Sequence, residues 1–486
     1  MTTKPKSRKT KIICTIGPSS GAKEILSKMI DSGMNVARFN LSHGSYDEYR
    51  EWAVTLRKLA REKNRPVALL CDLPGAKIRL GELYDGAKAV VLNQGETVYF
   101  TSGKPRSKDE LSFADGDYLS HIKTGDKILL NDGKIELVAR AKEDERLASE
   151  VTVAGEIAPF QGINLPDTKF DLPTLSDKDL DALHFALEIG ADAIGLSFVF
   201  NAENVRAARA EIARKVNHDS QDAPLPYLIA KIERGEAVEG INKIIAAADA
   251  IMVARGDLGL ELPEAEVPII QKKIIQLCLE AGKPVITATQ MLDSMQKNPR
   301  PTRAEVSDVA NAVFDGTDAL MLSGETATGD YPLESLEEMA KIAIEAETSQ
   351  FEKNDLEVKE GIINQIKITD AVGSSACQMA AEINADAIVC ATGSGYTARM
   401  IAKFRPKMPI IALTPHENTF RQLNFVWGVE SYILPGIHTT DELLTQAVTL
   451  LKEHQLVKSG NKIVITAGHP VGEVGQTNLI KVEKIV

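Results

Sequence analysis

Short apolar runs rich in β-branched residues alternate along the chain with stretches of helical periodicity, which predicts βα units that form parallel sheets. Eight of these runs come before residue 325, and one long insertion interrupts them. Eight parallel strands close a (β/α)8, or TIM, barrel. The predicted barrel strands are Lys11–Ile16, Asn35–Arg38, Val67–Cys71, Ala193–Ser197, Leu228–Lys231, Ala250–Val253, Val285–Ala288 and Ala319–Leu322.

The insertion between the third and fourth runs follows a different pattern. It contains alternating strands such as Val90–Leu92 and Glu136–Ala139, a turn at Asn131-Asp132-Gly133, and little helical periodicity. This pattern predicts an antiparallel β domain inserted into the barrel.

A second α/β block follows the barrel. A helical pattern at Leu333–Glu347 leads into the charged stretch Phe351–Glu360, and five further apolar runs then predict a small doubly wound domain. Its predicted strands are Ala387–Ala391, Ile410–Leu413, Ser431–Leu434, Ile463–Thr466 and Ile480–Val482. We therefore expect a TIM barrel at residues 1–72 and 169–347, an inserted β-rich lid domain that forms a small β-barrel at 73–168, and a C-terminal α/β domain at 348–486.

Polar residues follow the predicted barrel strands one after another. Loop charges are usually only solvated, but the carboxyl ends of barrel strands build active sites, and these residues should converge there. They are Arg38, Asn40, Ser42 and His43 after the second strand, Asp72 after the third, Ser197-Phe198 after the fourth, Lys231 and Glu233 at the fifth, Arg255 and Asp257 after the sixth, Thr289-Gln290 after the seventh, and Ser323-Gly324-Glu325 after the eighth.

The residues at the fifth and sixth strand ends are suited to phosphoryl transfer. Glu233 and Asp257 offer hard oxygen ligands for Mg²⁺. Lys231 and Arg38 can neutralise the charge that builds on a transferring phosphoryl group.

Other strand ends supply further binding and proton-transfer groups. Amides near Gly256 could bind a carboxylate or a phosphate, and Thr289 could donate a proton directly or through a water. No Ser–His–Asp arrangement or GxxxxGK[ST] loop appears, so hydrolase triads and Walker-type binding lose support. Gly393–Ala398 follows a strand, but the next strand ends in Thr414 instead of an acid, which favours a phosphate-cradling loop over a dinucleotide site.

Composition narrows the partners. The net charge of −12 gives no general attraction to nucleic acid or to an anionic membrane. Five widely spaced cysteines form no CxxC pair, which indicates buried reduced thiols. No apolar stretch is long enough to span a bilayer, and the basic N-terminus has no apolar core of a signal peptide. We expect a cytoplasmic enzyme.

The motifs, taken in order, resemble the pyruvate kinase family, and the resemblance runs nearly from end to end. It rests on Thr15-Ile16-Gly17-Pro18-Ser19-Ser20, Ala37-Arg38-Phe39-Asn40-Leu41-Ser42-His43-Gly44, Lys231-Ile232-Glu233, Arg255-Gly256-Asp257-Leu258-Gly259, Ala288-Thr289-Gln290-Met291-Leu292 and Met321-Leu322-Ser323-Gly324-Glu325-Thr326-Ala327. The resemblance implies transfer from phosphoenolpyruvate to ADP, an inserted lid, a C-terminal effector domain and a homotetramer.

The resemblance also implies a role for each matching residue. Glu233 and Asp257 look like ligands of Mg²⁺ or Mn²⁺, Lys231 like the transition-state cation, and Arg38 and Arg79 like phosphate binders. The remaining matches are Thr289 near the protonated carbon, the Gly256 and Asp257 amides at the substrate carboxylate, and Asn40 and His43 near the nucleotide of ADP or ATP.

One departure concerns a monovalent cation. Potassium-requiring members have Glu where this chain has Lys77, within a region that also includes Asn40, Ser42, Asp72 and Leu73. A carboxylate there favours a companion cation, whereas an ammonium supplies the charge itself. The chain therefore resembles the potassium-independent branch, and we expect K⁺ not to be required.

Two further departures concern the lid and the effector. Gln161 stands where many relatives have a Lys associated with nucleotide phosphates. The predicted effector loop holds Thr392, Ser394, Gly395 and Thr397, but the opposing segment 468–475 lacks the basic residues expected for binding a bisphosphate, and its Glu473 would repel a second phosphate. We expect a monophosphorylated sugar or AMP as the effector.

Two alternatives remain open. Gln161 and Asn131 would suit a catalytically weakened paralogue that senses nucleotide or sugar phosphate. A phosphoenolpyruvate/pyruvate barrel lyase shares a metal-bound enolate, but it leaves Asn40, His43 and the lid unexplained.

Overall fold

The computed structural model describes residues 8–75, 77–114, 116, 118–143, 145–168, 175–216, 224–353, 368–436, 439–469 and 477–486. Its central element is a closed barrel in which neighbouring strands run parallel, in the order β1-β16-β15-β14-β13-β12-β3-β2. All eight predicted strands are present. They are β1 (Lys11–Thr15), β2 (Val36–Asn40), β3 (Ala68–Asp72), β12 (Ala193–Leu196), β13 (Tyr227–Ile232), β14 (Ala250–Ala254), β15 (Val285–Ala288) and β16 (Ala319–Leu322).

Helices surround the barrel and bury its outer face. They are α1 (Lys23–Asp31), α2 (Tyr46–Glu62), α3 (Asp177–Glu188), α4 (Ala202–Lys215), α5 (Gly235–Glu239), α6 (Ile241–Ala247), α7 (Arg255–Glu261), α8 (Val267–Ala281), α9 (Arg303–Asp315), α10 (Gly324–Ala327) and α11 (Pro332–Lys353). A separate inner core fills the barrel with side chains such as Ile13, Met252 and Met321. Because this interior is packed, chemistry is confined to the ends of the strands.

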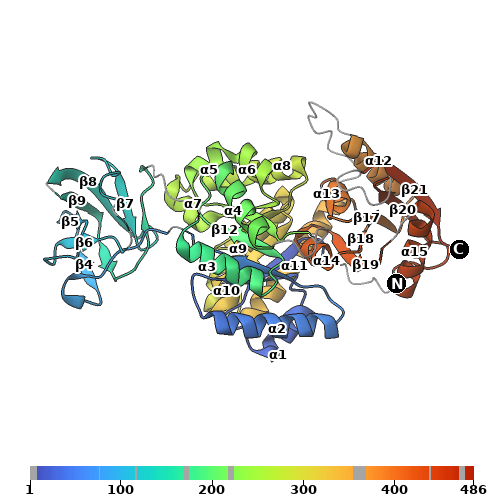
Figure 1. Cartoon of the computed structure of the whole chain (residues 1–486), viewed down its shortest axis with the longest axis horizontal. Helices are drawn as coiled ribbons and strands as arrows, with labels where there is room; N and C mark the ends of the chain where they lie inside the picture. The colour runs from blue at the N-terminus through green and yellow to red at the C-terminus, as the bar shows by residue number, and fades with distance from the viewer. Residues whose placement is uncertain are drawn as a thin grey trace.

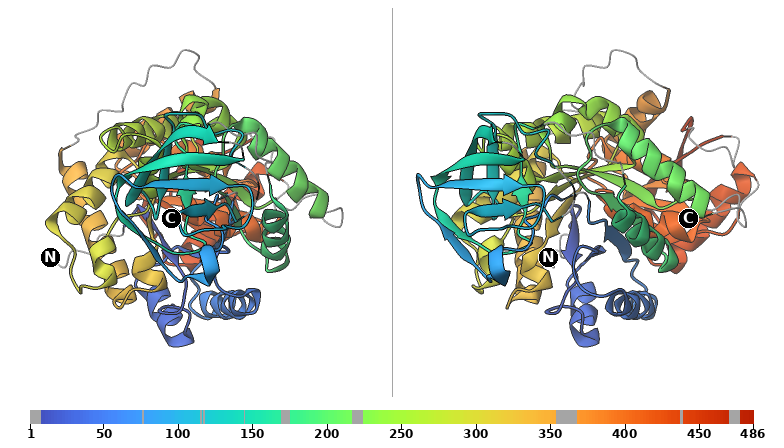
Figure 2. Two further views of the ribbon diagram at one scale, coloured as in Figure 1. Left: turned by 90° about the vertical axis from the view of Figure 1, so that its left-hand side faces the viewer. Right: turned by 60° about the vertical axis from the view of Figure 1, so that its left-hand side comes forward.

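The insertion folds as a β domain with its own core. Its six-stranded sheet has the order β11-β7-β8-β9-β5-β6, and β10 pairs with β4. The strands are β4 (Val90–Leu92), β5 (Thr97–Thr101), β6 (Glu110–Ser112), β7 (Lys127–Leu130), β8 (Ile135–Glu143), β9 (Arg146–Val153), β10 (Gly155–Ile157) and β11 (Ile163–Asn164). The predicted turn joins β7 to β8, with positive φ at Asn131, Asp132 and Gly133. The lid and the C-terminal domain lie at opposite ends of the barrel (Figure 1), and Figure 2 shows the lid in front of one barrel end.

The C-terminal domain is a five-stranded sheet in the order β19-β18-β17-β20-β21. All pairs are parallel except β20–β21, which is an antiparallel edge. Its elements are α12 (Ile368–Glu382), β17 (Ala387–Ala391), α13 (Tyr396–Ala402), β18 (Ile410–Thr414), α14 (Glu417–Gln422), the 3₁₀ turn η3 (Leu423–Phe425), β19 (Val429–Ile433), α15 (Thr440–Glu453), β20 (Lys462–Ala467) and β21 (Leu479–Lys484). The third strand therefore begins two residues before its predicted start at Ser431.

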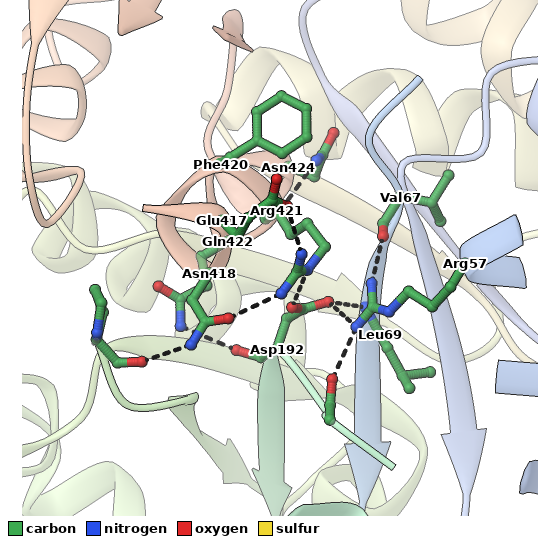
Figure 3. Close-up of polar contacts among 12 residues, drawn as sticks. Arg57, Val67, Leu69, Asp192, Glu417, Asn418, Phe420, Arg421, Gln422 and Asn424 are labelled. Atoms are coloured by element: carbon green, nitrogen blue, oxygen red, sulfur yellow. Dashed lines mark hydrogen bonds and ion pairs between the residues drawn. The ribbon is translucent and has the colours of Figure 1, made fainter. Parts of the chain in front are cut away.

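The base of the barrel is joined to α14 by a buried polar network. Asp192, just before β12, accepts hydrogen bonds from Arg421 Nε and Arg57 Nη2, each at 2.7 Å, and from the Leu69 amide at 2.7 Å. Gln422 Nε2 donates to the Leu225 carbonyl at 2.8 Å. Figure 3 shows Asp192 held between the two arginines. The network fixes the N-terminal ends of β3, β12 and β13 against the C-terminal domain.

Among the helices that the structure describes, we find none long and apolar enough to cross a membrane.

Candidate active site

Four neighbouring strand ends converge on one buried cluster of charges. Arg38, on β2, donates to Asp72 Oδ2 through Nε at 2.9 Å and through Nη2 at 2.5 Å. Lys231, on β13, places Nζ 3.3 Å from the same oxygen and 2.9 Å from Glu233 Oε1. Ser197, directly after β12, accepts from Lys231 Nζ at 2.7 Å. The structure thus brings together the cations Arg38 and Lys231 and two of the carboxylates predicted from the sequence, Asp72 and Glu233.

Burial makes the charges of this cluster depend on one another. Burial alone would lower the pKa of Lys231, but the carboxylates of Asp72 and Glu233 raise that pKa above its usual value. Burial likewise opposes ionisation of Asp72, yet Lys231 and Arg38 hold the pKa of Asp72 below its usual value. Lys231 and Asp72 are therefore both charged near neutral pH. The cations Lys231 and Arg38 are in position to bind an anionic ligand.

Asp257 completes the negative side of the site. It lies in the first turn of α7, and its charge adds to burial in raising the pKa of Glu233, which Lys231 offsets only in part. Two nearby carboxylates suit a shared cation, and carboxylate oxygens are the donors that Mg²⁺ prefers. Glu233 and Asp257 therefore fit a divalent metal, although the described residues contain no group of three or more His, Cys, Asp or Glu placed to hold one.

Thr289 and Gly256 lie together at the edge of the site. The Gly256 amide donates to Thr289 Oγ1 at 2.8 Å, and this hydroxyl donates to the Ala288 carbonyl at 2.6 Å. Thr289 has φ +67° and Gln290 φ +53°, a strained backbone for side-chain-bearing residues. Arg255 holds this turn by donating to the Thr289 carbonyl at 2.7 Å and pairing with Asp308 at 2.6 Å. Arg255 is thus a structural support of the turn.

A cavity of about 730 Å³ opens between the lid and the barrel beside this cluster. Lys77, Asp132, Gly256 and Asp257 are among its lining residues. Lys77 Nζ lies 3.6 Å from Asp132 Oδ1 and 3.9 Å from Asp257 Oδ1. In the part of the chain that the structure describes, this ammonium pairs with these two carboxylates and not with Asp72. The ammonium therefore lies inside the site, on its Asp257 side.

The remaining predicted nucleotide and cation residues lie on the β2 side and on the lid. Asn40 Oδ1 accepts from the Ser42 amide at 3.3 Å. His43 is largely exposed to solvent. Its pKa is lowered by the part of the ring that is desolvated and by the nearby positive charges of Arg79, Arg38 and Lys77. Arg79 donates to the Phe160 carbonyl at 3.1 Å from the lid's entry segment. Gln161 Oε1 accepts from Ala158 within the same lid at 2.9 Å.

The predicted effector loop lies in the C-terminal domain, between β17 and α13. Gly395 has φ +77°, Thr397 is buried with its hydroxyl 3.0 Å from Thr477 Oγ1, and Thr392 donates its amide to Leu413. Thr419 Oγ1, on α14, donates to the Gly393 carbonyl at 2.8 Å. Glu473 is one of residues 470–476, which lie outside the described residues, so its predicted role stays a prediction.

The sequence predicts that Ser197 and Phe198 lie at the site, but it indicates no partner for either residue. The structure places the Ser197 hydroxyl on Lys231 and the Phe198 amide 2.6 Å from Glu233 Oε2. The only signal in the sequence was their position directly after an apolar run. That signal marks a strand end but says nothing about a partner.

Comparisons with known proteins agree with this geometry. Residues 7–336 match the family described as "Pyruvate kinase, barrel domain", and residues 370–483 match "Pyruvate kinase, alpha/beta domain". A curated pyruvate kinase of Geobacillus stearothermophilus is 45% identical over 481 residues, which are 98% of this chain and 80% of that protein. One of Staphylococcus epidermidis is 43% identical with the same coverage. A crystal structure described as a pyruvate kinase from Cryptosporidium parvum has a TM-score of 0.89 and 36% identity, covering 99% of this chain and 96% of that one.

Proposed function

The chain belongs to the pyruvate kinase family of phosphotransferases, and on that premise we propose that it transfers the phosphoryl group of phosphoenolpyruvate to ADP, giving pyruvate and ATP in glycolysis. We further propose that the reaction needs Mg²⁺ and proceeds without K⁺. The observation that carries the proposal is the buried cluster in which Arg38 and Lys231 share one oxygen of Asp72, with Glu233 beside them.

Phosphoryl transfer needs positive charge where negative charge develops. The bond between phosphorus and the enol oxygen of phosphoenolpyruvate breaks, leaving that oxygen on the enolate, and a new bond forms between phosphorus and a terminal β-phosphate oxygen of ADP. Lys231 and Arg38 would stabilise the equatorial oxygens during this transfer, since both are charged and held rigidly by buried partners. Arg79, on the lid, would add a further phosphate contact. Asn40 and His43 would lie near the nucleotide.

Glu233 and Asp257 would hold the divalent ion, Mg²⁺ or Mn²⁺. When bound, such an ion neutralises charge on phosphate and enolate oxygens. The Gly256 and Asp257 amides would bind the substrate carboxylate. Since the Gly256 amide now donates to Thr289 Oγ1, a bound carboxylate would replace that hydroxyl as its acceptor.

The leaving enolate must gain a proton at carbon to become pyruvate. Thr289 is the residue of this site suited to supply it, directly or through a water. Its hydroxyl donates to the Ala288 carbonyl at 2.6 Å. Release from the Gly256 amide would free the hydroxyl to rotate toward the substrate.

Independence from K⁺ follows from the charge that Lys77 carries into the cavity. Its ammonium lies 3.9 Å from Asp257, and its side chain is only 26% exposed. A fixed cation there supplies positive charge and repels a second monovalent ion. Asp72, the other carboxylate of the predicted cation region, already has Arg38 and Lys231 as partners.

Regulation and assembly complete the proposal. A monophosphorylated sugar or AMP would bind the loop containing Thr392, Ser394, Gly395 and Thr397, and the chain would act as a cytoplasmic homotetramer. Strong activation by micromolar fructose 1,6-bisphosphate would contradict the monophosphate preference.

The test of the catalytic proposal is ³¹P NMR of phosphoenolpyruvate, ADP and Mg²⁺ with the protein. We expect the phosphoenolpyruvate signal to be replaced by the γ-phosphate of ATP. Lys231→Met should abolish this conversion, while Lys63→Met, which removes a surface partner of Asp31, should not change it. Release of inorganic phosphate without ATP, or conversion that survives Lys231→Met, would contradict the proposal.

A further inference from the structure

One hydroxyl joins the proposed transition-state cation to the polypeptide that leads into the lid. Ser197 Oγ lies 2.7 Å from Lys231 Nζ and 2.8 Å from the Leu73 carbonyl. An ammonium can only donate, so the hydroxyl must accept from Lys231 and use its single proton on Leu73. The direction of both hydrogen bonds is therefore fixed.

Phe198, the residue after Ser197, binds Glu233, the carboxylate that pairs with Lys231. The Phe198 amide donates to Glu233 Oε2 at 2.6 Å. Phe198 has φ +52°, a left-handed backbone that a bulky residue adopts only where its surroundings enforce it. The turn formed by these two residues thus contacts Lys231 through the Ser197 hydroxyl and Glu233 through the Phe198 backbone amide.

Residues 73–75, which we call the lid stem, pack directly on this turn. The Leu73 amide donates to the Gly195 carbonyl at 2.9 Å, and the Gly75 amide donates to Asp179 Oδ1 at 2.7 Å. A Cβ on Gly75 would stand 2.6 Å from Ser197 Cβ and 2.7 Å from the Phe198 ring, and Gly75 has φ +72°. No side chain fits between the stem and the turn.

We propose that Ser197 is a positioning residue for phosphoryl transfer, which fixes the Lys231 ammonium and links its position to that of the lid stem. Ser197 does not touch the reacting atoms; it completes the set of three acceptors around Lys231, with Glu233 and Asp72 as the other two. This inference rests on the proposed function. A serine that only closed a strand end would affect folding and leave turnover per folded molecule unchanged.

The first test measures kcat and KM of Ser197→Ala. We expect kcat to fall ~10- to 100-fold, because Lys231 gains freedom to leave its catalytic position, while KM for phosphoenolpyruvate changes less than about 3-fold. Ser197→Thr keeps the hydroxyl and should recover most of the loss. Ser197→Cys keeps the size but accepts poorly, and it should show the same loss even if the alanine variant fails to fold.

The matched control is Ser149→Ala. Ser149 is fully buried in lid strand β9, and its hydroxyl has no hydrogen-bond partner among the residues that the structure describes. This variant should leave kcat and KM unchanged. If Ser197→Ala, or Ser197→Cys in its place, retains kcat within about 2-fold of the wild type, the inference is wrong. A wild type without turnover would instead refute the proposed function, so the two failures are distinguishable.

The second test addresses the link to the lid stem. Gly75→Ala should displace Ser197 and lower kcat in the wild-type background, but it should cost little more in the Ser197→Ala background, because the same hydrogen bond is lost in both. Gly86→Ala is the control, since Gly86 has φ +66° with open space around it. Equal losses from Gly75→Ala in both backgrounds would overturn the link.

Discussion

Replacing Asp192 by alanine should loosen the junction between the barrel and the C-terminal domain. The Asp192 side chain is 1% exposed and accepts from Arg421, Arg57 and the Leu69 amide. Removing one member of a buried charge pair typically costs about 3–5 kcal/mol, because the partner charge is left uncompensated. Arg57 and Arg421 are 19% and 21% exposed, so water can compensate them in part. We therefore expect a loss of about 3 kcal/mol.

Hydrogen exchange measures this loss locally and does not require two-state unfolding of a multidomain chain. A tenfold change in the exchange rate corresponds to about 1.4 kcal/mol. Amides at the N-terminal end of β3, including Leu69, should therefore exchange about 100-fold faster in the variant. Asp31→Ala removes a solvent-exposed partner of Lys63 and should change exchange less than about 5-fold, as expected for a surface pair. Exchange in Asp192→Ala within about 3-fold of the wild type would show that Asp192 does not stabilise this end of β3.

Three further variants test other parts of the structure. Lys77→Glu should make activity depend on K⁺, because a carboxylate replaces the fixed cation; equal rates of the variant with and without K⁺ would contradict this. Asp72→Asn should reduce the loss of folding stability at acid pH. Burial opposes ionisation of Asp72, but Lys231 and Arg38 hold its pKa below the usual value. The ionised carboxylate therefore stabilises the fold fully above its unfolded pKa of about 4, and this stabilisation disappears as the pH falls through the lower folded pKa. Melting temperatures measured from pH 7 to 3 check this, and parallel curves for variant and wild type would disprove it. Thr302→Ala removes the capping box of α9, in which the Thr302 hydroxyl accepts from the Glu305 amide, and should cost about 1 kcal/mol in thermal unfolding with little effect on kcat; an unchanged melting temperature would show that the cap contributes nothing.

The barrel could be predicted because each strand is a short buried run that is mostly apolar on both faces, with polar residues chiefly at its ends. The exception in the C-terminal domain shows the limit of this signal. β19 begins at Val429, but exposed Glu430 interrupts the apolar run, and pairing with β18 sets the true start. Register with a neighbouring strand, which a local pattern does not contain, decided that boundary.

The charged members of the site were visible because charge is rare at the end of a buried run. The contacts that orient them were not. Ser197 carries no charge, and its partner Lys231 lies 34 residues away. The pairing of Asp192 with Arg421 spans 229 residues and joins two domains. The position of Lys77 also depended on tertiary structure, since among the described residues it pairs with Asp132 of the lid and Asp257 of the barrel and not with Asp72.

The most direct test of the account is pyruvate formation from phosphoenolpyruvate by the wild-type protein, with ADP and Mg²⁺, in potassium-free and potassium-rich buffer. We predict turnover that requires both ADP and Mg²⁺ and is equal in the two buffers. Turnover only in the potassium-rich buffer would contradict the role of Lys77, and absence of pyruvate in both buffers would contradict the proposed phosphoryl transfer itself.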